Sequence, residues 1–378
     1  MKKKAFMKKK VLAGVVAAML LLSGCGGNSG DTPNEQSTKD SSAEESLSAD
    51  NESDSAEASN ASASAENAGK ESTESTAAES SVSETEKKAD PPAPVIASNT
   101  KPEDYNTEPV AFKDEIDEFN AQVTIDSTNR DAHHTQRKLY VDGIPLIEVV
   151  NTDFPSPKPL VFALHGGGGQ KSDSELYTLA DKGFCAVAID CAGNGESQDG
   201  PLQAPAAFME TVHDLDVLVE YYNTLSDVDA ENFGIIGYSM GGNIAMCYVP
   251  YGKYKPTAIA FACSTPDPLV DRGPVWDVFD KGKNGQPAVW TGDEMESFVS
   301  AYKAVNFPEY FVDVWVFAAN GAEDDEAGPP AGCAALKEKV EALGGTKFSH
   351  QIFEGYGHEV PESWFRDTLS EFCEKLLP

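Results

Sequence analysis

Short apolar runs alternate with helix-like stretches along the last three quarters of the chain. Several runs are apolar at every position rather than at alternate positions, which is typical of strands covered on both faces. The predicted strands are 139–141, 146–150, 160–164, 184–189, 233–236, 258–262, 312–318 and 348–353. The predicted helices are 172–182, 206–225, 239–249, 331–343 and 361–376. Strands that alternate with helices predict an α/β fold with a mostly parallel, doubly wound sheet and helices on both faces.

Residues 265–310 interrupt this alternation. They hold Trp276, Trp290, Phe298 and Tyr302 among many polar, Gly and Pro residues. An insertion at a strand end often forms a lid or a substrate wall. The alternative is an ordinary long connection with one or two helices.

The first 25 residues have the pattern of an export signal. Two Lys clusters precede an apolar run at 11–22, which is shorter than the about 20 residues of a membrane-spanning helix. The run ends in Leu-Ser-Gly-Cys at 22–25, which resembles the lipobox of bacterial lipoproteins. This resemblance implies that Cys25 is lipidated and that the exported protein is anchored at the outer face of the membrane. The alternative is an ordinary signal peptide in which Cys25 has no role.

Residues 26–104 are predicted to be a disordered acidic tether. They contain no Phe, Trp or Tyr and are rich in Ser, Ala and Glu. Such a segment buries too little apolar surface to offset the loss of conformational entropy on folding. Residues 26–90 hold 16 acidic and 4 basic side chains, whose mutual repulsion favours an extended spacer. The remaining residues, 105–378, are of a suitable size for one folded domain.

The net charge argues against one class of partner. The chain carries −33, and residues 91–378 alone carry −27. Such an acidic domain is not expected to bind nucleic acids or other anionic polymers.

Six cysteines follow Cys25, and their spacing predicts no metal site, because no Cys-x-x-Cys or Cys/His ligand pattern occurs. An even number in an exported protein permits disulfides, whereas the apolar surroundings of several favour buried thiols, so the pairing stays open. The six are Cys185, Cys191, Cys247, Cys263, Cys333 and Cys373.

A nucleophile is predicted directly after the apolar run 233–236. Residues 237–242 read Gly-Tyr-Ser-Met-Gly-Gly, which is Gly-x-Ser-x-Gly between a strand and a helix. Glycines on both sides of a sharp turn avoid collisions with the neighbouring elements and tolerate strained dihedral angles. The sequence therefore predicts that Ser239 is the nucleophile.

A serine hydroxyl needs a base within hydrogen-bond reach. His358 suits this role, because it lies on a loop between the last strand and the last helix with glycines before it at 355 and 357. The other five histidines lie in a polar stretch, a helix, a strand or at the start of a Gly-rich loop. They are His133, His134, His213, His350 and His165.

The acid that orients the imidazole is expected in the loop after the strand 312–318. Residues 320–326 of that loop read Asn-Gly-Ala-Glu-Asp-Asp-Glu. The Gly-x-x-Asp spacing favours Asp324, and Asp325 is the alternative. The chain order is then Ser239, Asp324, His358.

The oxyanion formed by attack on a carbonyl needs N–H donors that are already in place. Residues 164–169 read Leu-His-Gly-Gly-Gly-Gly after a predicted strand, and glycines allow the main chain to approach a substrate. We expect the donors to be the N–H groups of Gly167 and Met240, with Gly168 as the alternative to Gly167. A phosphate-binding loop is disfavoured, because no Lys-Ser/Thr pair follows the glycines.

Together these motifs resemble the α/β-hydrolase family, particularly exported esterases similar to dienelactone hydrolases and prolyl-oligopeptidase-type catalytic domains. Residues 190–197 also look like the Asp-x-x-Gly-x-Gly-x-Ser turn of that family, in which the aspartate is structural. The resemblance runs from about residue 159 to the C-terminus, and the segment 105–158 is expected to supply edge strands.

The resemblance implies an ester hydrolase that works through an acyl-enzyme on Ser239 without a cofactor or metal. The implied substrates are small carboxylic esters or ester groups on polysaccharides. Two alternatives stay open: a peptidase of the prolyl-oligopeptidase type, and a non-catalytic surface binding protein on a hydrolase scaffold.

Overall fold

The computed structural model describes residues 108–197, 204–267, 292–325 and 328–377. The predicted signal peptide, Cys25 and the predicted tether lie outside these ranges. Residues 268–291 of the segment 265–310, which include Trp276 and Trp290, also lie outside them. No helix within the described ranges is both long enough and apolar enough to cross a membrane.

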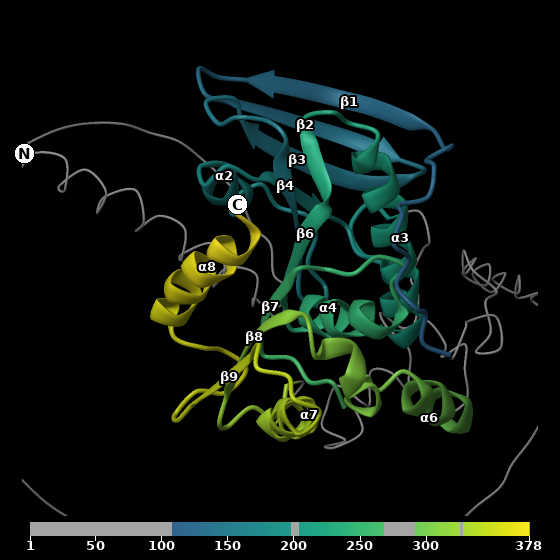
Figure 1. Cartoon of the computed structure of the whole chain (residues 1–378), viewed down its shortest axis with the longest axis vertical. Coiled ribbons are helices and arrows are strands. Elements are labelled where there is room, and N and C mark those ends of the chain that lie inside the picture. The colour runs from purple at the N-terminus through teal and green to yellow at the C-terminus, as the bar shows by residue number, and fades with distance from the viewer. Residues whose placement is uncertain (1–107, 198–203, 268–291, 326–327, 378) are drawn as a thin grey trace, which may run out of the picture. The chain divides into compact units, whose positions relative to one another are not determined.

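Nine strands form one sheet in the order β1-β2-β3-β5-β4-β6-β7-β8-β9 (Figure 1). The strands from β5 to β9 in this order are parallel, whereas β1, β2, β3 and β5 pair antiparallel. The bounds are β1 Val123–Arg130, β2 His134–Val141, β3 Ile144–Asn151, β4 Lys158–Leu164, β5 Cys185–Ile189, β6 Val228–Tyr238, β7 Ala258–Ala262, β8 Trp315–Gly321 and β9 Phe348–Phe353. The prediction of a mostly parallel α/β sheet is confirmed, and the segment before β4 supplies the antiparallel edge.

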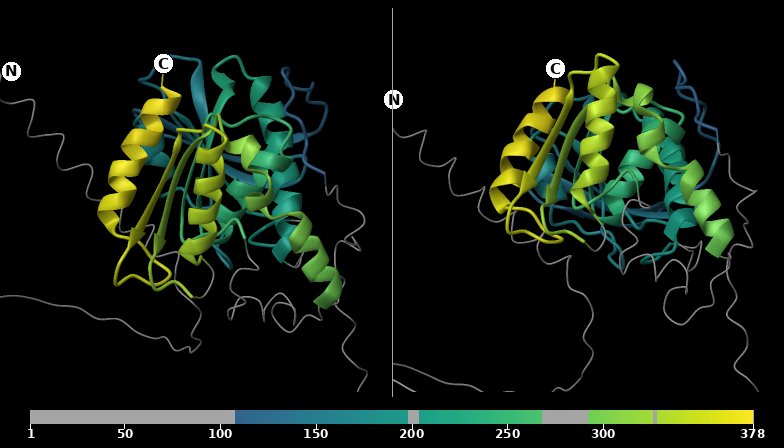
Figure 2. Two further views of the ribbon diagram at one scale, coloured as in Figure 1. Left: turned by 60° about the horizontal axis from the view of Figure 1, so that its bottom comes forward. Right: turned by 90° about the horizontal axis from the view of Figure 1, so that it is seen from below.

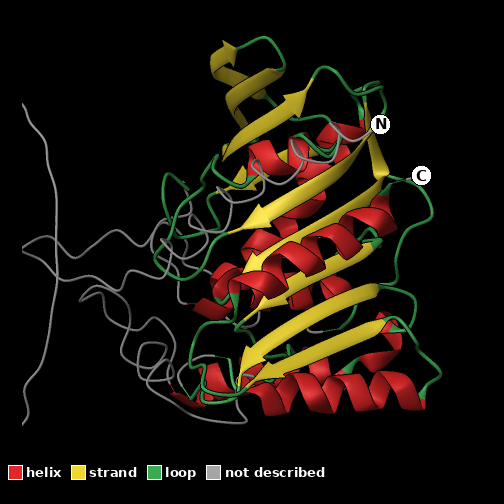
Figure 3. Ribbon diagram, turned by 90° about the vertical axis from the view of Figure 1, so that its left-hand side faces the viewer, coloured by secondary structure: helices red, strands yellow, loops and turns green. Residues whose placement is uncertain are grey.

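Helices cover both faces of this sheet (Figure 3). Helices α2 and α8 pack on one face, and helices α3, α4 and α7 pack on the other. Figure 2 shows α8 and α7 on opposite sides of the last two strands. The helix bounds are α2 Leu176–Ala180, α3 Ala204–Asn223, α4 Met240–Tyr251, α6 Gly292–Ala301, α7 Pro330–Ala342 and α8 Glu362–Leu376, with short 3-10 helices η3 Ala304–Asn306 and η4 Pro308–Phe311.

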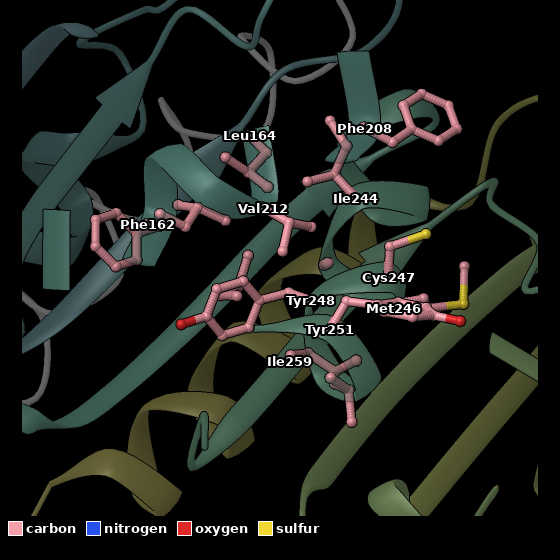
Figure 4. Close-up of a cluster of buried hydrophobic side chains, with 14 of the residues drawn as sticks. Phe162, Leu164, Phe208, Val212, Ile244, Met246, Cys247, Tyr248, Tyr251 and Ile259 are labelled. Atoms are coloured by element: carbon pink, nitrogen blue, oxygen red, sulfur yellow. The ribbon is translucent and has the colours of Figure 1, made fainter. Parts of the chain in front are cut away.

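The central strands are apolar throughout because both of their faces are buried. Successive side chains of a strand point to opposite faces, so Val161 of β4 packs in the core under α2 and α8 while Phe162 packs in the core under α3 and α4. Both side chains are fully buried. Figure 4 shows Phe162 among the side chains of α3, α4 and β7, including Val212, Tyr248 and Ile259.

Strand β1 was not predicted individually, because its side chains give no apolar pattern. Seven of its eight residues are exposed, including Val123 and Ile125. Strand β8 also begins later than predicted, because residues 312–314 form the turn that follows the 3-10 helix η4.

The six cysteines after Cys25 are all buried and carry free thiols in the structure. Burial as apolar side chains, rather than pairing, therefore accounts for their positions in the apolar runs.

The parallel register brings the carboxyl ends of the strands level at one edge of the sheet. Leu164 pairs with Gly237, Tyr238 with Ala262, and Ala262 with Ala319. Loops that follow parallel strands at this edge are where α/β proteins build their sites. The predicted nucleophile, acid, base and Gly-rich loop all follow these strands.

His134 links the antiparallel edge to α2 and should make stability depend on pH. Its Nε2 lies 2.7 Å from an oxygen of Asp181, and its Nδ1 lies 3.3 Å from an oxygen of Asp131. Burial by itself would lower the pKa of His134, but the two carboxylates outweigh it and raise that pKa above its usual value. This stabilisation is complete below the pKa of the unfolded chain, about 6.5, and is lost as pH rises through the folded pKa.

We therefore expect Asp181→Asn to reduce the free energy of unfolding more at about pH 5.5 than at about pH 8.5. Urea unfolding at both pH values measures the difference. Asp153→Asn is the matched control, because Asp153 pairs with His133 in an exposed ion pair, and such pairs contribute little. A loss of stability for Asp181→Asn that does not shrink at the higher pH would contradict the assignment.

Candidate active site

Ser239 lies on the turn between β6 and α4, in a strained backbone conformation. Its φ of 52° and ψ of −114° are unusual for any residue other than glycine, and such strain costs roughly 1–3 kcal/mol. The turn is held from both sides, because the N–H of Ser239 donates to Ala262 and its carbonyl accepts from the N–H groups of Gly242 and Asn243. The side chain is thus presented at the carboxyl edge of the sheet.

The glycines on either side of Ser239 are required by close backbone packing. A Cβ at Gly237 would lie 2.3 Å from the carbonyl carbon of Gly241, and a Cβ at Gly241 would lie 2.3 Å from the carbonyl oxygen of Leu164. The overlapping atoms belong to the backbone, so they cannot shift away from a Cβ without disrupting the turn. Glycine is therefore needed at both positions to avoid collisions with neighbouring elements, as the sequence predicts.

The structure brings Ser239, His358 and Asp324 into one chain of hydrogen bonds. His358 Nε2 lies 2.9 Å from Ser239 Oγ, and His358 Nδ1 lies 2.8 Å from Asp324 Oδ2. A carboxylate oxygen only accepts, so it fixes the ring proton on Nδ1 and leaves the lone pair of Nε2 facing the serine hydroxyl. Asp324 is fully buried, whereas Asp325 is exposed. The geometry thus favours Asp324 as the partner of His358.

The loop after β8, which holds Asp324, and the loop after β9, which holds His358, are joined by main-chain hydrogen bonds. They are called the acid loop and the histidine loop. The N–H of Glu323 donates to Tyr356, and the N–H of Ala322 donates to Phe353. A Cβ at Gly321 would lie 2.0 Å from the carbonyl oxygen of Gly357. Two loops that are far apart in the sequence can therefore meet closely enough to place Asp324 against His358.

Tyr238 also positions the histidine loop, a role that the sequence analysis missed. Its hydroxyl donates to the carbonyl oxygen of His358, and its ring contacts the imidazole edge-on, with centroids 5.7 Å apart. Burial, followed by the nearby Cys263 and Asp324, raises the pKa of Tyr238, so the phenol keeps its proton and stays a donor. Its place in the motif, directly before the nucleophile, was the only signal.

We expect Tyr238→Phe to lower kcat about 3- to 10-fold with little change in KM, because one hydrogen bond worth about 1 kcal/mol that positions His358 is lost. Steady-state kinetics on an aryl ester measures both constants. Tyr356→Phe, in the same loop as His358, should stay within about twofold of the parent. An unchanged kcat for Tyr238→Phe would show that the hydroxyl does not position the imidazole.

The Gly-rich loop passes directly beside Ser239. A Cβ at Gly166 would lie 3.6 Å from the Cβ of Ser239, whereas the space around Gly167 is open. The carbonyl of Gly166 accepts from His165 Nδ1 at 2.8 Å and from the N–H of Gly169 at 3.0 Å. In a trans peptide the next N–H points the opposite way, so the N–H of Gly167 is turned away from these partners.

Met240 supplies the other predicted donor. It is the first residue of α4, so its N–H has no acceptor within the helix and lies at the positive end of the helix dipole. A negative oxygen formed next to Ser239 would be stabilised there.

Buried side chains fix the Gly-rich loop at both ends. His165 accepts the N–H of Cys191 at its Nε2, so its single proton lies on Nδ1, where it holds the Gly166 carbonyl. Asp190 accepts the main-chain N–H of Lys171 at 2.6 Å and that of Glu196 at 2.8 Å. Both residues shape the loop and the 190–197 turn.

This nucleophile turn at the carboxyl edge of a mostly parallel sheet, with acid and base on the loops after later strands, defines the serine hydrolases of the α/β-hydrolase class. The chain shares the fold of this class. A family model described as serine aminopeptidase, S33, matches residues 155–275. A protein of Escherichia coli (strain K12), the uncharacterized protein YcjY, is 33% identical over 84 residues, which span 22% of this chain and 27% of that protein.

Solved structures show the same fold at low sequence identity. An acetyl xylan esterase from Paenibacillus sp. R4 is 17% identical, with a TM-score of 0.53 over 69% of this chain and 90% of that one. A glucuronoyl esterase from Solibacter usitatus is 14% identical, with a TM-score of 0.51 over 72% of this chain and 90% of that one.

Proposed function

We propose that the chain is a carboxylic ester hydrolase that acts through an acyl-enzyme on Ser239. The observation that carries this proposal is the hydrogen-bonded chain from Ser239 through His358 to the buried Asp324. A non-catalytic binding protein would not need a strained serine, a base and a buried acid held in this order.

The two steps of the reaction use the same groups. Ser239 Oγ attacks the ester carbonyl while His358 Nε2 takes its proton, and the N–H groups of Gly167 and Met240 stabilise the negative oxygen. The intermediate collapses, and His358 returns the proton to the departing alcohol. Water, deprotonated by His358, then attacks the acyl-enzyme and releases the acid, and Ser239 regains its proton. Asp324 stabilises the imidazolium formed in both steps.

The proposed substrates are acyl esters on neutral polysaccharides. Two structures with the same fold are named as esterases, one for acetyl xylan and one for glucuronoyl esters. The charge of −27 on residues 91–378 disfavours strongly anionic polymers. An enzyme anchored through Cys25 at the outer face of the membrane would meet such polymers outside the cell.

A substrate panel tests this proposal on the purified full-length chain. We expect hydrolysis of p-nitrophenyl acetate and release of acetate from acetylated xylan, with little release of p-nitroaniline from aminoacyl anilides. The matched family model is described as an aminopeptidase, so peptidase activity is the second candidate. Cleavage of the anilides without cleavage of the esters would establish that candidate instead, and a chain that cleaves neither would overturn both.

The proposed anchor is tested separately by fractionation of cells that express the full-length chain. The parent should partition with membranes, and Cys25→Ser should be released from them, because a diacylated cysteine anchors stably whereas a polar tether does not. Cys263→Ser, which changes a buried thiol, is the control and should partition like the parent. Membrane partitioning of Cys25→Ser would contradict the anchor.

A further inference from the structure

The thiol of Cys263 lies within 4.8 Å of Asp324 and His358, and the backbone of Cys263 has a conformation that a cysteine rarely adopts. It follows the last residue of β7, is fully buried and has a φ of 56°. A positive φ at a residue other than glycine costs energy and tends to persist at functional sites. The thiol takes no part in the ester hydrolysis proposed for Ser239, His358 and Asp324.

The thiol completes a set of metal-binding groups. The ligand atoms of Cys263, Asp324 and His358 all lie within 4.8 Å of one another, and no other such group of three occurs among the described residues. The histidine nitrogen that faces Asp324 is Nδ1, on the side of the ring away from Ser239. Thiolate, imidazole and carboxylate are the ligands that zinc and related thiophilic divalent cations prefer.

We propose that Cys263, Asp324 and His358 bind a thiophilic divalent cation of the zinc type, and that the bound cation reversibly inhibits the hydrolase. The cation would bind the Cys263 thiolate, an Asp324 oxygen and His358 Nδ1. Its two positive charges balance those of the thiolate and the carboxylate, so the buried site is neutral overall once the cation is bound. One proton, that of the thiol, leaves to solvent.

Inhibition follows from the position of the ring proton. When Nδ1 binds the cation, the neutral imidazole must carry its proton on Nε2. Nε2 then has no lone pair to accept the proton of Ser239 Oγ, although the two atoms are 2.9 Å apart. The inhibitory part of the proposal rests on the proposed function, whereas cation binding does not.

Of the three proposed ligands, only His358 is partly exposed to solvent. The side chain of His358 is 23% exposed, whereas Asp324 is fully covered. The thiol gives up its proton when the cation binds, because the thiolate is the form that ligates metals.

Direct titration with Cd²⁺ tests binding without reference to activity. The full-length chain carries Cys25→Ser, so the six remaining thiols are those that the structure describes as buried. We expect one Cd²⁺ to bind with the ultraviolet absorption of a cadmium–thiolate bond, both in this chain and after Ser239→Ala. Cys263→Ser should abolish the band, and Asp324→Asn, which keeps the thiol, should weaken binding at least tenfold.

Cys333→Ser is the matched control. Cys333 is also buried, and its thiol donates to the carbonyl of Ser264, the residue after Cys263. It should keep the band and the affinity. A band that survives Cys263→Ser, or the absence of a band in the parent, would overturn the site. Circular dichroism of each variant verifies that it is folded.

Inhibition is measured on ester hydrolysis with Zn²⁺ and its reversal by a chelator. Each variant is compared with its own rate in the absence of metal. The parent and Cys333→Ser should be inhibited alike, and Cys263→Ser should resist at least tenfold more Zn²⁺. If Cd²⁺ binds through Cys263 but Zn²⁺ does not slow hydrolysis, the inhibitory part is wrong. If the chain hydrolyses no ester, the Cd²⁺ titration still decides the binding part.

Discussion

Ser239→Ala lowers kcat/KM for p-nitrophenyl acetate by about 10⁴- to 10⁶-fold, which is the largest effect that we expect from any substitution in this chain. The hydroxyl forms the covalent bond to the acyl group, and alanine offers no atom to replace it. The N–H groups of Gly167 and Met240 and the binding of substrate remain, so a small residual rate above that of the reaction in water is expected. The turn should stay intact, because its hydrogen bonds come from the main chain of residue 239.

Steady-state kinetics and mass spectrometry of the trapped acyl-enzyme measure this effect. The parent should gain the mass of an acetyl group on the peptide that contains Ser239, and Ser239→Ala should gain none. Ser226→Ala is the matched control, because Ser226 is exposed in the turn before β6 and should retain the parent rate within about twofold. A Ser239→Ala protein that hydrolyses the ester as fast as the parent would rule out this nucleophile.

Asp324→Asn should lower kcat about 10⁴-fold with a much smaller change in KM. An amide can present its NH₂ group to His358 Nδ1, which would then have to accept rather than donate. The ring proton would move to Nε2, and the lone pair that takes the proton of Ser239 would be lost. The imidazolium of the transition state would also lose the buried negative charge beside it.

Asp325→Asn is the matched control for the acid, because it makes the same chemical change one residue away. Asp325 is exposed whereas Asp324 is buried against His358, so its substitution should alter kcat less than about threefold. The comparison of the two variants decides which carboxylate is used. A larger loss for Asp325→Asn would reassign the acid, and equal small losses would show that neither carboxylate is needed.

Much of the fold follows from the sequence, because buried parallel strands have a distinctive pattern. Strand β7 is apolar at every position and was predicted with the same bounds that the structure shows. Strand β1 was not predicted, since an exposed edge strand needs no apolar face and its pairing with β2 comes from main-chain hydrogen bonds.

The candidate site was predicted where a local motif marks it and missed where contacts are formed across the sheet. Ser239 is marked by the glycines that its turn requires, and His358 by its loop after the last strand. The roles of Tyr238 and Cys263 were not predicted, because each side chain meets the histidine loop from the end of another strand. Tyr238 is the last residue of β6 and Cys263 follows the last residue of β7, and these positions become informative only once the strand order is known.

The sequence by itself determined the class of fold, and it predicted Ser239 as the nucleophile and His358 as the base, because close backbone approach and strand burial restrict which residues can occupy those positions. Only the tertiary structure chose between Asp324 and Asp325, since two adjacent carboxylates differ in burial and direction rather than in local pattern. It also left the six cysteines after Cys25 unpaired and placed the thiol of Cys263 within 4.8 Å of Asp324 and His358. These outcomes depend on distances between segments that are far apart in the chain, and the register of the parallel sheet sets those distances.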